Sequence, residues 1–278
     1  MTSRGDSILM YHGTPRRDAA HLERQLRALG MLFHIVPLEE LTRPRPNGRR
    51  IALTFDDGLK SNVEVAYPIL RKLGLPATFY VCPGLIESGG WLWNHEARQR
   101  LLSLPAPALA ELAATVGGPA EVEALVEWMK GLKLPARVKV EEAIRAATRD
   151  FRPTPEQRDE FEIAGWDDLR KLDPRVVTIG SHTLSHPILT SLAPDEVDRE
   201  LRESRSVLEH RLQREVKNFC YPNGDLDDDA VKAARRYYDS AVTVEQGSLD
   251  HDVDPHRMPR FAARPRDTLR LARRLAFG

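Results

Sequence analysis

Two short clusters of polar residues have types and spacing that could bind a divalent metal. Asp56 and Asp57 directly follow the apolar run at residues 51–55, within the sequence TFDDG. His182 and His186 lie four residues apart in the sequence SHTLSH. Adjacent carboxylates destabilise each other unless a cation or hydrogen bonds compensate, and two histidines with one carboxylate are a typical ligand set for a divalent metal.

Each cluster alone has a simpler interpretation, as a turn and as a pair of surface histidines. The two together are harder to explain in this way, because both follow strands of a parallel sheet, and active sites of parallel barrels lie at that end of the strands. Three protein ligands leave positions open for water and substrate, which favours a catalytic site. The second aspartate would then serve as a general base on that water.

The elements that position these clusters alternate between strand and helix. Short β-forming runs predict seven strands, at residues 8–11, 32–36, 51–55, 77–81, 176–180, 217–221 and 240–244. Apolar residues at helical spacing predict helices between them, at residues 19–29, 61–73 and 194–212. This alternation indicates an α/β fold, and about seven strands favour a (β/α) barrel over an open sheet.

One long segment interrupts the alternation. Residues 93–162 contain almost no strand pattern, whereas residues 121–132 carry apolar side chains along one helical face. We therefore predict a single domain over residues 1–278 with a helical insertion at about 93–162, long enough to form a lid or a subdomain.

The composition excludes several classes of protein. The 278 residues include 41 Lys and Arg and 41 Asp and Glu, so the formal net charge is zero, whereas nucleic-acid binders usually carry a basic excess. A hydrophobic content of 41% argues against a disordered chain. Without any run of about 18 apolar residues, we expect no transmembrane helix.

The early apolar stretch and the cysteines bear on cellular location. The stretch at residues 8–11 is too short for a secretion signal, so we expect a cytoplasmic protein. In that compartment Cys82 and Cys220 are expected to be reduced, buried thiols.

In this order, the two clusters resemble the polysaccharide deacetylase family, the carbohydrate esterase group (family 4) that shares the NodB homology domain. Weaker elements extend the resemblance. The sequence MYH ending at His12 is similar to the early YH element of the exopolysaccharide-deacetylase-like branch. Residues 219–224 (FCYPNG) are similar to the third motif, and residues 258–261 (MPRF) to the closing PR element.

The resemblance implies a deformed (β/α) barrel that binds a divalent metal, most often zinc, with cobalt, nickel or manganese as alternatives. Carried over by position, Asp57, His182 and His186 would be the metal ligands. Asp56 would be the base that activates the metal-bound water for attack on an N-acetyl carbonyl. The backbone N–H of Asn223 would help to stabilise the resulting oxyanion.

A general acid must protonate the leaving amine, and three histidines are candidates. Family members with the early YH element imply His12 for this role. Other members take the acid from a late motif, which makes His251 and His256 the alternatives.

The third motif departs from the family pattern. Many members have an arginine there that orients the base aspartate, and here Cys220 stands near that position. Arg260 could supply the guanidinium instead, because its fixed donor fork can orient a carboxylate and keep it ionised. The alternative is an ordinary surface arginine. Cys220 itself is expected to be a packed strand residue.

Other residues could shape the substrate site or the surface. We predict that Tyr221 helps to line the pocket. Trp93, with its neighbours in the segment 91–95, either stacks against a sugar or anchors the insertion to the barrel. Residues 264–274 contain five arginines among apolar residues, which fits a solvated barrel helix or peripheral contact with an anionic membrane.

Three functions remain open. The leading hypothesis is a metal-dependent hydrolase that removes an N-acetyl group from an acetylamino sugar in a glycan or glycan precursor. One alternative is a deformylase or cyclic-amide hydrolase on the same scaffold. The intact pair Asp56 and Asp57 favours deacetylation over this alternative. The other is a catalytically silent glycan-binding protein of exopolysaccharide assembly, against which the retained base, the three metal ligands and the candidate acid argue. The sequence makes no prediction of the oligomeric state.

Overall fold

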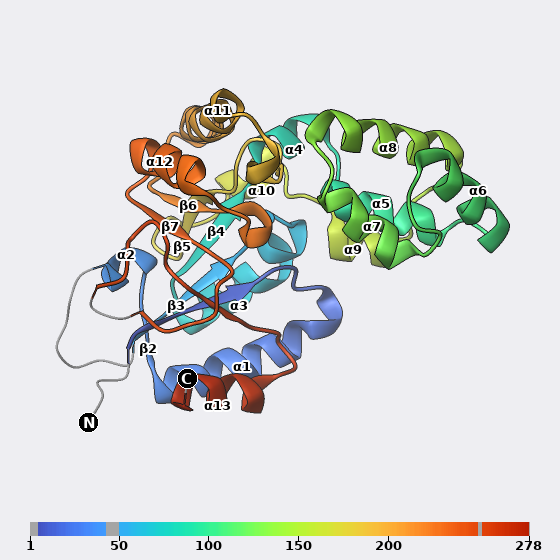
Figure 1. Cartoon of the computed structure of the whole chain (residues 1–278). Helices are drawn as coiled ribbons and strands as arrows, with labels where there is room; N and C mark the ends of the chain where they lie inside the picture. The colour runs from blue at the N-terminus through green and yellow to red at the C-terminus, as the bar shows by residue number, and fades with distance from the viewer. Residues whose placement is uncertain (1–4, 43–49, 250–251, 278) are drawn as a thin grey trace.

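The fold is built on a curled parallel sheet (Figure 1). The computed structural model describes residues 5–42, 50–249 and 252–277. The strands are β1 (Ser7–Tyr11), β2 (His34–Ile35), β3 (Arg50–Phe55), β4 (Ala77–Val81), β5 (Val177–Ser181), β6 (Asn218–Cys220), β7 (Ser240–Val242) and β8 (Phe261–Ala262). They pair in the order β7-β6-β5-β4-β3-β1-β8, with β2 paired to β3 beside this path. All of these pairs are parallel.

The predicted α/β fold with a deformed barrel of about seven strands is confirmed, as an open half-barrel. Every residue of β1, β3 and β4 is buried, which explains why these strands are continuous apolar runs rather than alternating ones. Helices surround the sheet, namely α1 (Ala19–Leu32), α2 (Leu38–Leu41), α3 (Tyr67–Leu73), α10 (Trp166–Arg170), α11 (Pro194–Leu212), α12 (Asp228–Tyr237) and α13 (Thr268–Phe277).

The structure differs from the prediction at the edges of the sheet. β2 has two residues and β7 has three, where the sequence predicts five in each. The sequence does not predict β8, because two residues next to Pro259 are too few to show a strand pattern. The helix predicted at residues 61–73 begins as a π-helical turn, Asn62–Ala66, and continues as α3.

Between β4 and β5 the chain leaves the sheet and forms a group of helices to one side of it (Figure 1). After α4 (Pro83–Ser88) these are α5 (Trp93–Leu102), α6 (Ala106–Val116), α7 (Val122–Lys130), α8 (Leu134–Ala147) and α9 (Pro155–Phe161). Leu101, Leu125 and Met129 form the centre of a hydrophobic core within this insertion. Ile188, which lies outside the insertion in sequence, is buried in the same core.

The chain returns from the insertion beside the loop that follows β3. The backbone N–H of Ala164 donates to the carbonyl of Gly58 at 2.9 Å, and that of Lys60 donates to the carbonyl of Glu162 at 2.7 Å. The insertion is therefore attached to the sheet next to the aspartate pair.

The arginine-rich helix α13 packs as a helix of the barrel. Leu271 and Leu275 belong to the main hydrophobic core, whereas Leu269 is exposed. Arg274 donates a hydrogen bond to the carbonyl of Ala262. The apolar face of α13 is thus used in packing against the barrel. Among the described residues, no helix has the length and apolar character needed to cross a membrane.

Candidate functional site

The carboxyl ends of β1, β3, β5 and β6 meet at a pocket of about 120 Å³. Parallel strands bring residues that are distant in sequence to the same edge of a sheet. Nine residues singled out in the sequence line this pocket: His12, Asp56, Asp57, His182, His186, Tyr221 and Asn223, together with Asn94 and His95 of the segment 91–95.

The side chains of Asp57, His182 and His186 fit a single divalent cation. Nε2 of His182 lies 3.5 Å from Oδ1 of Asp57, and Nε2 of His186 lies 3.6 Å from the same oxygen. All three residues are buried. Ligand atoms around a tetrahedral zinc are about 3.4 Å apart, because each lies about 2.1 Å from the ion. The observed spacing is therefore that of ligands that share one ion.

Hydrogen bonds from neighbouring groups orient these ligands. Nδ1 of His182 lies 2.7 Å from the carbonyl of Cys220; a carbonyl can only accept, so Nδ1 carries the hydrogen and Nε2 faces Asp57. Glu200 of α11 holds the loop between the two histidines. Its carboxylate accepts from the N–H of Leu184 at 2.9 Å, and from the N–H and Oγ of Ser185 at 3.0 Å and 2.8 Å.

The site loops have unusual backbone conformations. Five non-glycine residues of the described chain have a positive φ, and four of them lie in these loops: Asp57 (73°), Thr183 (67°), His186 (58°) and Asn223 (55°). Asp, Asn and His tolerate the left-handed region better than most residues, whereas β-branched Thr183 adopts it at a higher cost. Such strain is found where a functional geometry must be held.

Asp56 forms a bidentate ion pair with Arg260. Its two oxygens accept from the two terminal nitrogens of Arg260, each at 2.8 Å. Arg260 is fully buried and also donates to Oγ1 of Thr54 at 2.9 Å and to the carbonyl of Thr243 at 2.7 Å. Burial acts to raise the pKa of Asp56, but the Arg260 guanidinium outweighs it and holds that pKa below its ordinary value. Arg260 is therefore not a surface arginine.

The three ligand side chains titrate together. Burial opposes the charge of Asp57, but the hydrogen bond from His182 and the nearby imidazoles hold the pKa of Asp57 well below its usual range. Burial lowers the pKa of His186 to about 3, with His182 adding to the effect. Burial also opposes the charge of His182, but the hydrogen bond to the Cys220 carbonyl and the carboxylate of Asp57 outweigh it and raise the pKa of His182 well above its ordinary value. Without a cation, His182 therefore carries the proton.

A second group, Asp56, His182 and Cys220, is also compact enough to hold an ion. Both oxygens of Asp56 are engaged by Arg260. Burial raises the pKa of Cys220, so the residue stays a thiol, whereas a metal requires the thiolate. The group that contains Asp57 is therefore the better metal site. Cys220 and Cys82 are buried, unbonded cysteines.

The remaining predicted pocket residues differ in how they face it. His12 follows β1 and is exposed at the pocket. Tyr221 is buried, and its hydroxyl donates to the carbonyl of His256 at 3.0 Å. Nδ2 of Asn223 is buried and has no hydrogen-bond partner among the described residues.

Two other candidates do not reach the pocket. Trp93 is buried in the core of the insertion, where the Arg137 guanidinium lies 4.5 Å from its ring; this placement favours anchoring over sugar stacking. Nε2 of His256 lies 2.8 Å from the carbonyl of Tyr238, and His256 does not line the pocket. His251 lies outside the described residues.

Other functional positions have little or no sequence signal. Leu92 and Val244 line the pocket but are ordinary apolar residues in loops. Glu200 also belongs to no motif. The one sequence signal for Glu200 is that its carboxylate lies next to Leu201 on the buried face of α11, where a charge needs a specific partner.

A deformed half-barrel with three residues that fit a divalent cation at the carboxyl edge of its sheet places this protein in the class of α/β barrels. The family profile of polysaccharide deacetylases matches residues 43–238, which is more than half of the chain. The chain therefore belongs to the polysaccharide deacetylase family, as the sequences TFDDG and SHTLSH predict.

Individual relatives are distant. YxkH of Bacillus subtilis (strain 168), which carries the same family name, is 21% identical over 270 residues, covering 93% of this chain and 71% of YxkH. The deacetylase PplD of Streptococcus pyogenes, solved in complex with acetate, has a TM-score of 0.66 and 19% identity, with 99% of each chain covered. The polysaccharide deacetylase BC0361 of Bacillus cereus has a TM-score of 0.64 and 17% identity, covering 98% of this chain and 69% of BC0361. At these identities the solved structures show a shared fold alone.

Proposed function

We propose that this chain is a metal-dependent hydrolase that removes an N-acetyl group from an acetylamino sugar in a glycan or glycan precursor. One observation carries the proposal. A cation-binding group and an ionised, arginine-held carboxylate lie in the same pocket, on adjacent residues Asp57 and Asp56. In a polysaccharide deacetylase family member, this pairing supplies the two components that amide hydrolysis by water requires.

Asp57, His182 and His186 would hold the cation, with zinc favoured by the mixed nitrogen and oxygen ligands and cobalt, nickel or manganese as alternatives. When bound, the cation would supply Lewis acidity for a water molecule and for the acyl oxygen. Asp56 takes the proton of the attacking water. Arg260 keeps that carboxylate ionised and fixes its plane through two hydrogen bonds of 2.8 Å.

Two further residues complete the proposed reaction. The backbone N–H of Asn223 would donate to the acyl oxygen as negative charge develops there, which is supported by the position of Asn223 in the pocket. His12 would donate a proton to the leaving amine, because it is exposed at the same pocket and can receive that proton from solvent. The product pair is acetate and a free amino sugar.

The test is acetate release by the purified chain loaded with zinc or cobalt. The substrates are N-acetylglucosamine oligomers and nucleotide-linked or lipid-linked acetylamino sugars. We expect acetate from at least one of them, and no acetate after the metal is removed by a chelator. If the metal is bound and none of the substrates yields acetate, the proposal fails. Formate release from N-formyl sugars would instead support a deformylase.

A further inference from the structure

One imidazole in the pocket comes from the insertion rather than from the barrel. His95, in the first turn of α5, lines the pocket together with the metal-site residues. Its Nδ1 is buried without a hydrogen-bond partner, and no hydrogen bond to either ring nitrogen is made by the described residues. A buried polar atom that is left unpaired costs free energy. The ring is therefore available for a ligand that supplies the missing hydrogen bond.

Aromatic packing fixes the position of this ring. The Phe161 ring, at the end of α9, lies 4.9 Å from the His95 ring at an angle of 50°. Phe161 in turn packs against Trp91, with ring centroids 5.5 Å apart. His95, at the beginning of the insertion, is thus packed against Phe161 at its end, and this contact reduces the side-chain entropy that remains to be lost when a ligand binds.

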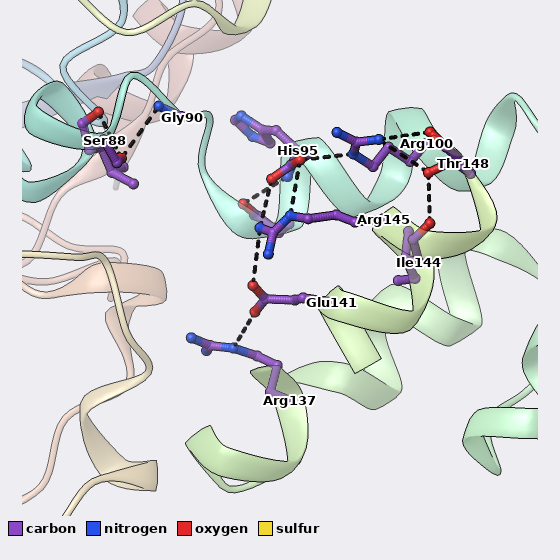
Figure 2. A network of polar contacts seen from close by, with 12 residues as sticks. Ser88, Gly90, His95, Arg100, Arg137, Glu141, Ile144, Arg145 and Thr148 are labelled. Carbon is purple, nitrogen blue, oxygen red and sulfur yellow. Dashed lines mark hydrogen bonds and ion pairs between the residues drawn. The ribbon is translucent and has the colours of Figure 1, made fainter. Parts of the chain in front are cut away.

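The backbone on both sides of His95 is anchored as well. Two positions before it, Trp93 is covered by the Arg137 guanidinium at 4.5 Å. One position after it, Glu96 accepts from Arg100 and from Arg145, each at 2.8 Å. Figure 2 shows a ladder of charged side chains between α5 and α8, in which Arg137, Glu141 and Arg145 are joined by ion pairs, with His95 at the start of α5. A site residue on an anchored helix is positioned more accurately than one on a loop.

We propose that His95 is a substrate-contacting residue, which the insertion contributes to the site and which hydrogen-bonds to a hydroxyl or amide group of the acetylated sugar. The proposal rests on the function proposed above and extends it to a residue outside the barrel. Asn223 Nδ2, the other buried and unpaired nitrogen donor in the pocket apart from the ligand His186, offers the sugar a second polar contact. Together they favour a ligand that carries more than one polar group.

The protonation state of His95 suits this role. Burial lowers the pKa of His95, although Asp57 opposes the effect, so the ring is neutral at pH 7. A neutral imidazole offers one donor and one acceptor. It can therefore pair with a sugar hydroxyl, which also donates and accepts, without adding charge beside the cation site.

The experiment compares His95→Ala and His95→Gln in the zinc-loaded full chain. The substrate is the N-acetylglucosamine tetramer, or whichever sugar wild type hydrolyses fastest. We expect His95→Ala to lower kcat/KM by about 10- to 100-fold, as expected for the loss of a polar substrate contact, with unchanged zinc content and melting temperature. His95→Gln keeps a donor and an acceptor and should recover part of the loss. The matched control His210→Ala changes an exposed histidine on α11 and should behave as wild type.

A binding measurement separates failure of this proposal from failure of the proposed function. In zinc-loaded Asp56→Asn, quenching of tryptophan fluorescence by the same sugar gives a Kd without turnover, and adding His95→Ala should raise that Kd about tenfold. If wild type hydrolyses no sugar, the proposed function has failed. If wild type is active while His95→Ala retains full kcat/KM and Kd, or loses activity only through loss of zinc, the role given to His95 is overturned.

Discussion

Asp56 and Asp57 are neighbours in the chain, but their surroundings give them different chemistry. Arg260 binds both oxygens of Asp56 and balances the charge of that carboxylate, which makes it a poorer metal ligand than Asp57 while leaving lone pairs free to accept a proton. Asp57 faces His182 and His186, so its charge is balanced by ligands that share a cation. The left-handed φ of Asp57 turns the two side chains to different partners. Two adjacent like charges are tolerated because each has its own positive counterpart.

This difference predicts that the two aspartates can be separated by mutation. Asp57→Ala and His186→Ala should lose bound metal and activity together, because each removes a ligand. Asp56→Asn should keep the metal and lose activity by about 10²- to 10⁴-fold, which is the usual contribution of a general base. Metal content by atomic emission and acetate release are measured on the same samples.

Asp167→Asn serves as the control for these variants, because the Asp167 side chain is 86% exposed and does not line the pocket. It should keep both metal and activity. An active Asp56→Asn variant would show that another group is the base, and an Asp57→Ala variant with full zinc content would place the metal elsewhere.

The affinity of the site for zinc should depend on pH, and the protonation of His182 determines whether it rises or falls. In the metal-free site the pKa of His182 is raised, so the ring is protonated at neutral pH and zinc must displace that proton. Zinc affinity should therefore fall as pH falls, by about tenfold per pH unit for one proton. Calorimetric titration in two buffers with different ionisation enthalpies measures the proton released. Affinity that is constant between about pH 6 and pH 8 would contradict this assignment.

Much of the cation site could be predicted from the sequence, because Asp57, His182 and His186 lie in two short motifs that each follow a strand. For Arg260 the sequence leaves two roles open, that of a guanidinium that orients Asp56 and that of an ordinary surface arginine. Arg260 is 204 residues from Asp56, and that region is brought to the site by the pairing of β8 with β1 and by the parallel bridge between Met258 and Val242 of β7. A strand of two residues leaves no pattern from which this pairing could be predicted.

Among the elements, α5 carries two residues, Trp93 and His95, whose roles cannot be assigned from the sequence. Successive residues of a helix are rotated by about 100°, so Trp93 and His95 face directions about 160° apart. Trp93 faces the core of the insertion and His95 faces the pocket. The sequence could not distinguish them, because Trp and His in the segment 91–95 are both reasonable for either environment. Their roles become clear only from the orientation of α5 relative to the barrel in the structure.

The loop between the metal ligands should depend on helix α11. Glu200 is mostly buried and accepts three hydrogen bonds from Leu184 and Ser185. Glu200→Ala would leave those two N–H groups unpaired and release the loop, so zinc affinity should fall by about 10- to 100-fold, as for other losses around metal ligands. Competition with a zinc-binding dye measures the affinity.

Glu203→Ala is the matched control on the same helix, because the Glu203 side chain is 44% exposed and pairs only loosely with Arg202, at 3.7 Å. It should bind zinc as wild type does. If Glu200→Ala lowers the melting temperature but leaves zinc affinity unchanged, the contribution of Glu200 is to stability and not to the site.

For the whole molecule, the cation should stabilise the folded state, because the ligands come from the loop after β3 and from the loop after β5 and meet only when the sheet is formed. Zinc at about 100 times its Kd should add about 2.7 kcal/mol to the free energy of unfolding. For a chain of this size that corresponds to a rise of about 5 °C in Tm, measured by differential scanning fluorimetry. A chelator should reverse the rise, and Asp57→Ala should show none; an equal rise in that variant would mean that zinc binds elsewhere.

The attachment of the insertion limits how this protein can be engineered. The segment that ends the insertion is hydrogen-bonded to Gly58 and Lys60, immediately after the aspartates, and Ile188, two residues after His186, is packed inside the insertion core. A graft of this segment from a relative would therefore disturb both the base and the metal loop unless these two contacts were transplanted with it. Chimeras whose junctions lie outside residues 58–188 should retain function. Chimeras whose junctions lie at the ends of the insertion helices should lose it.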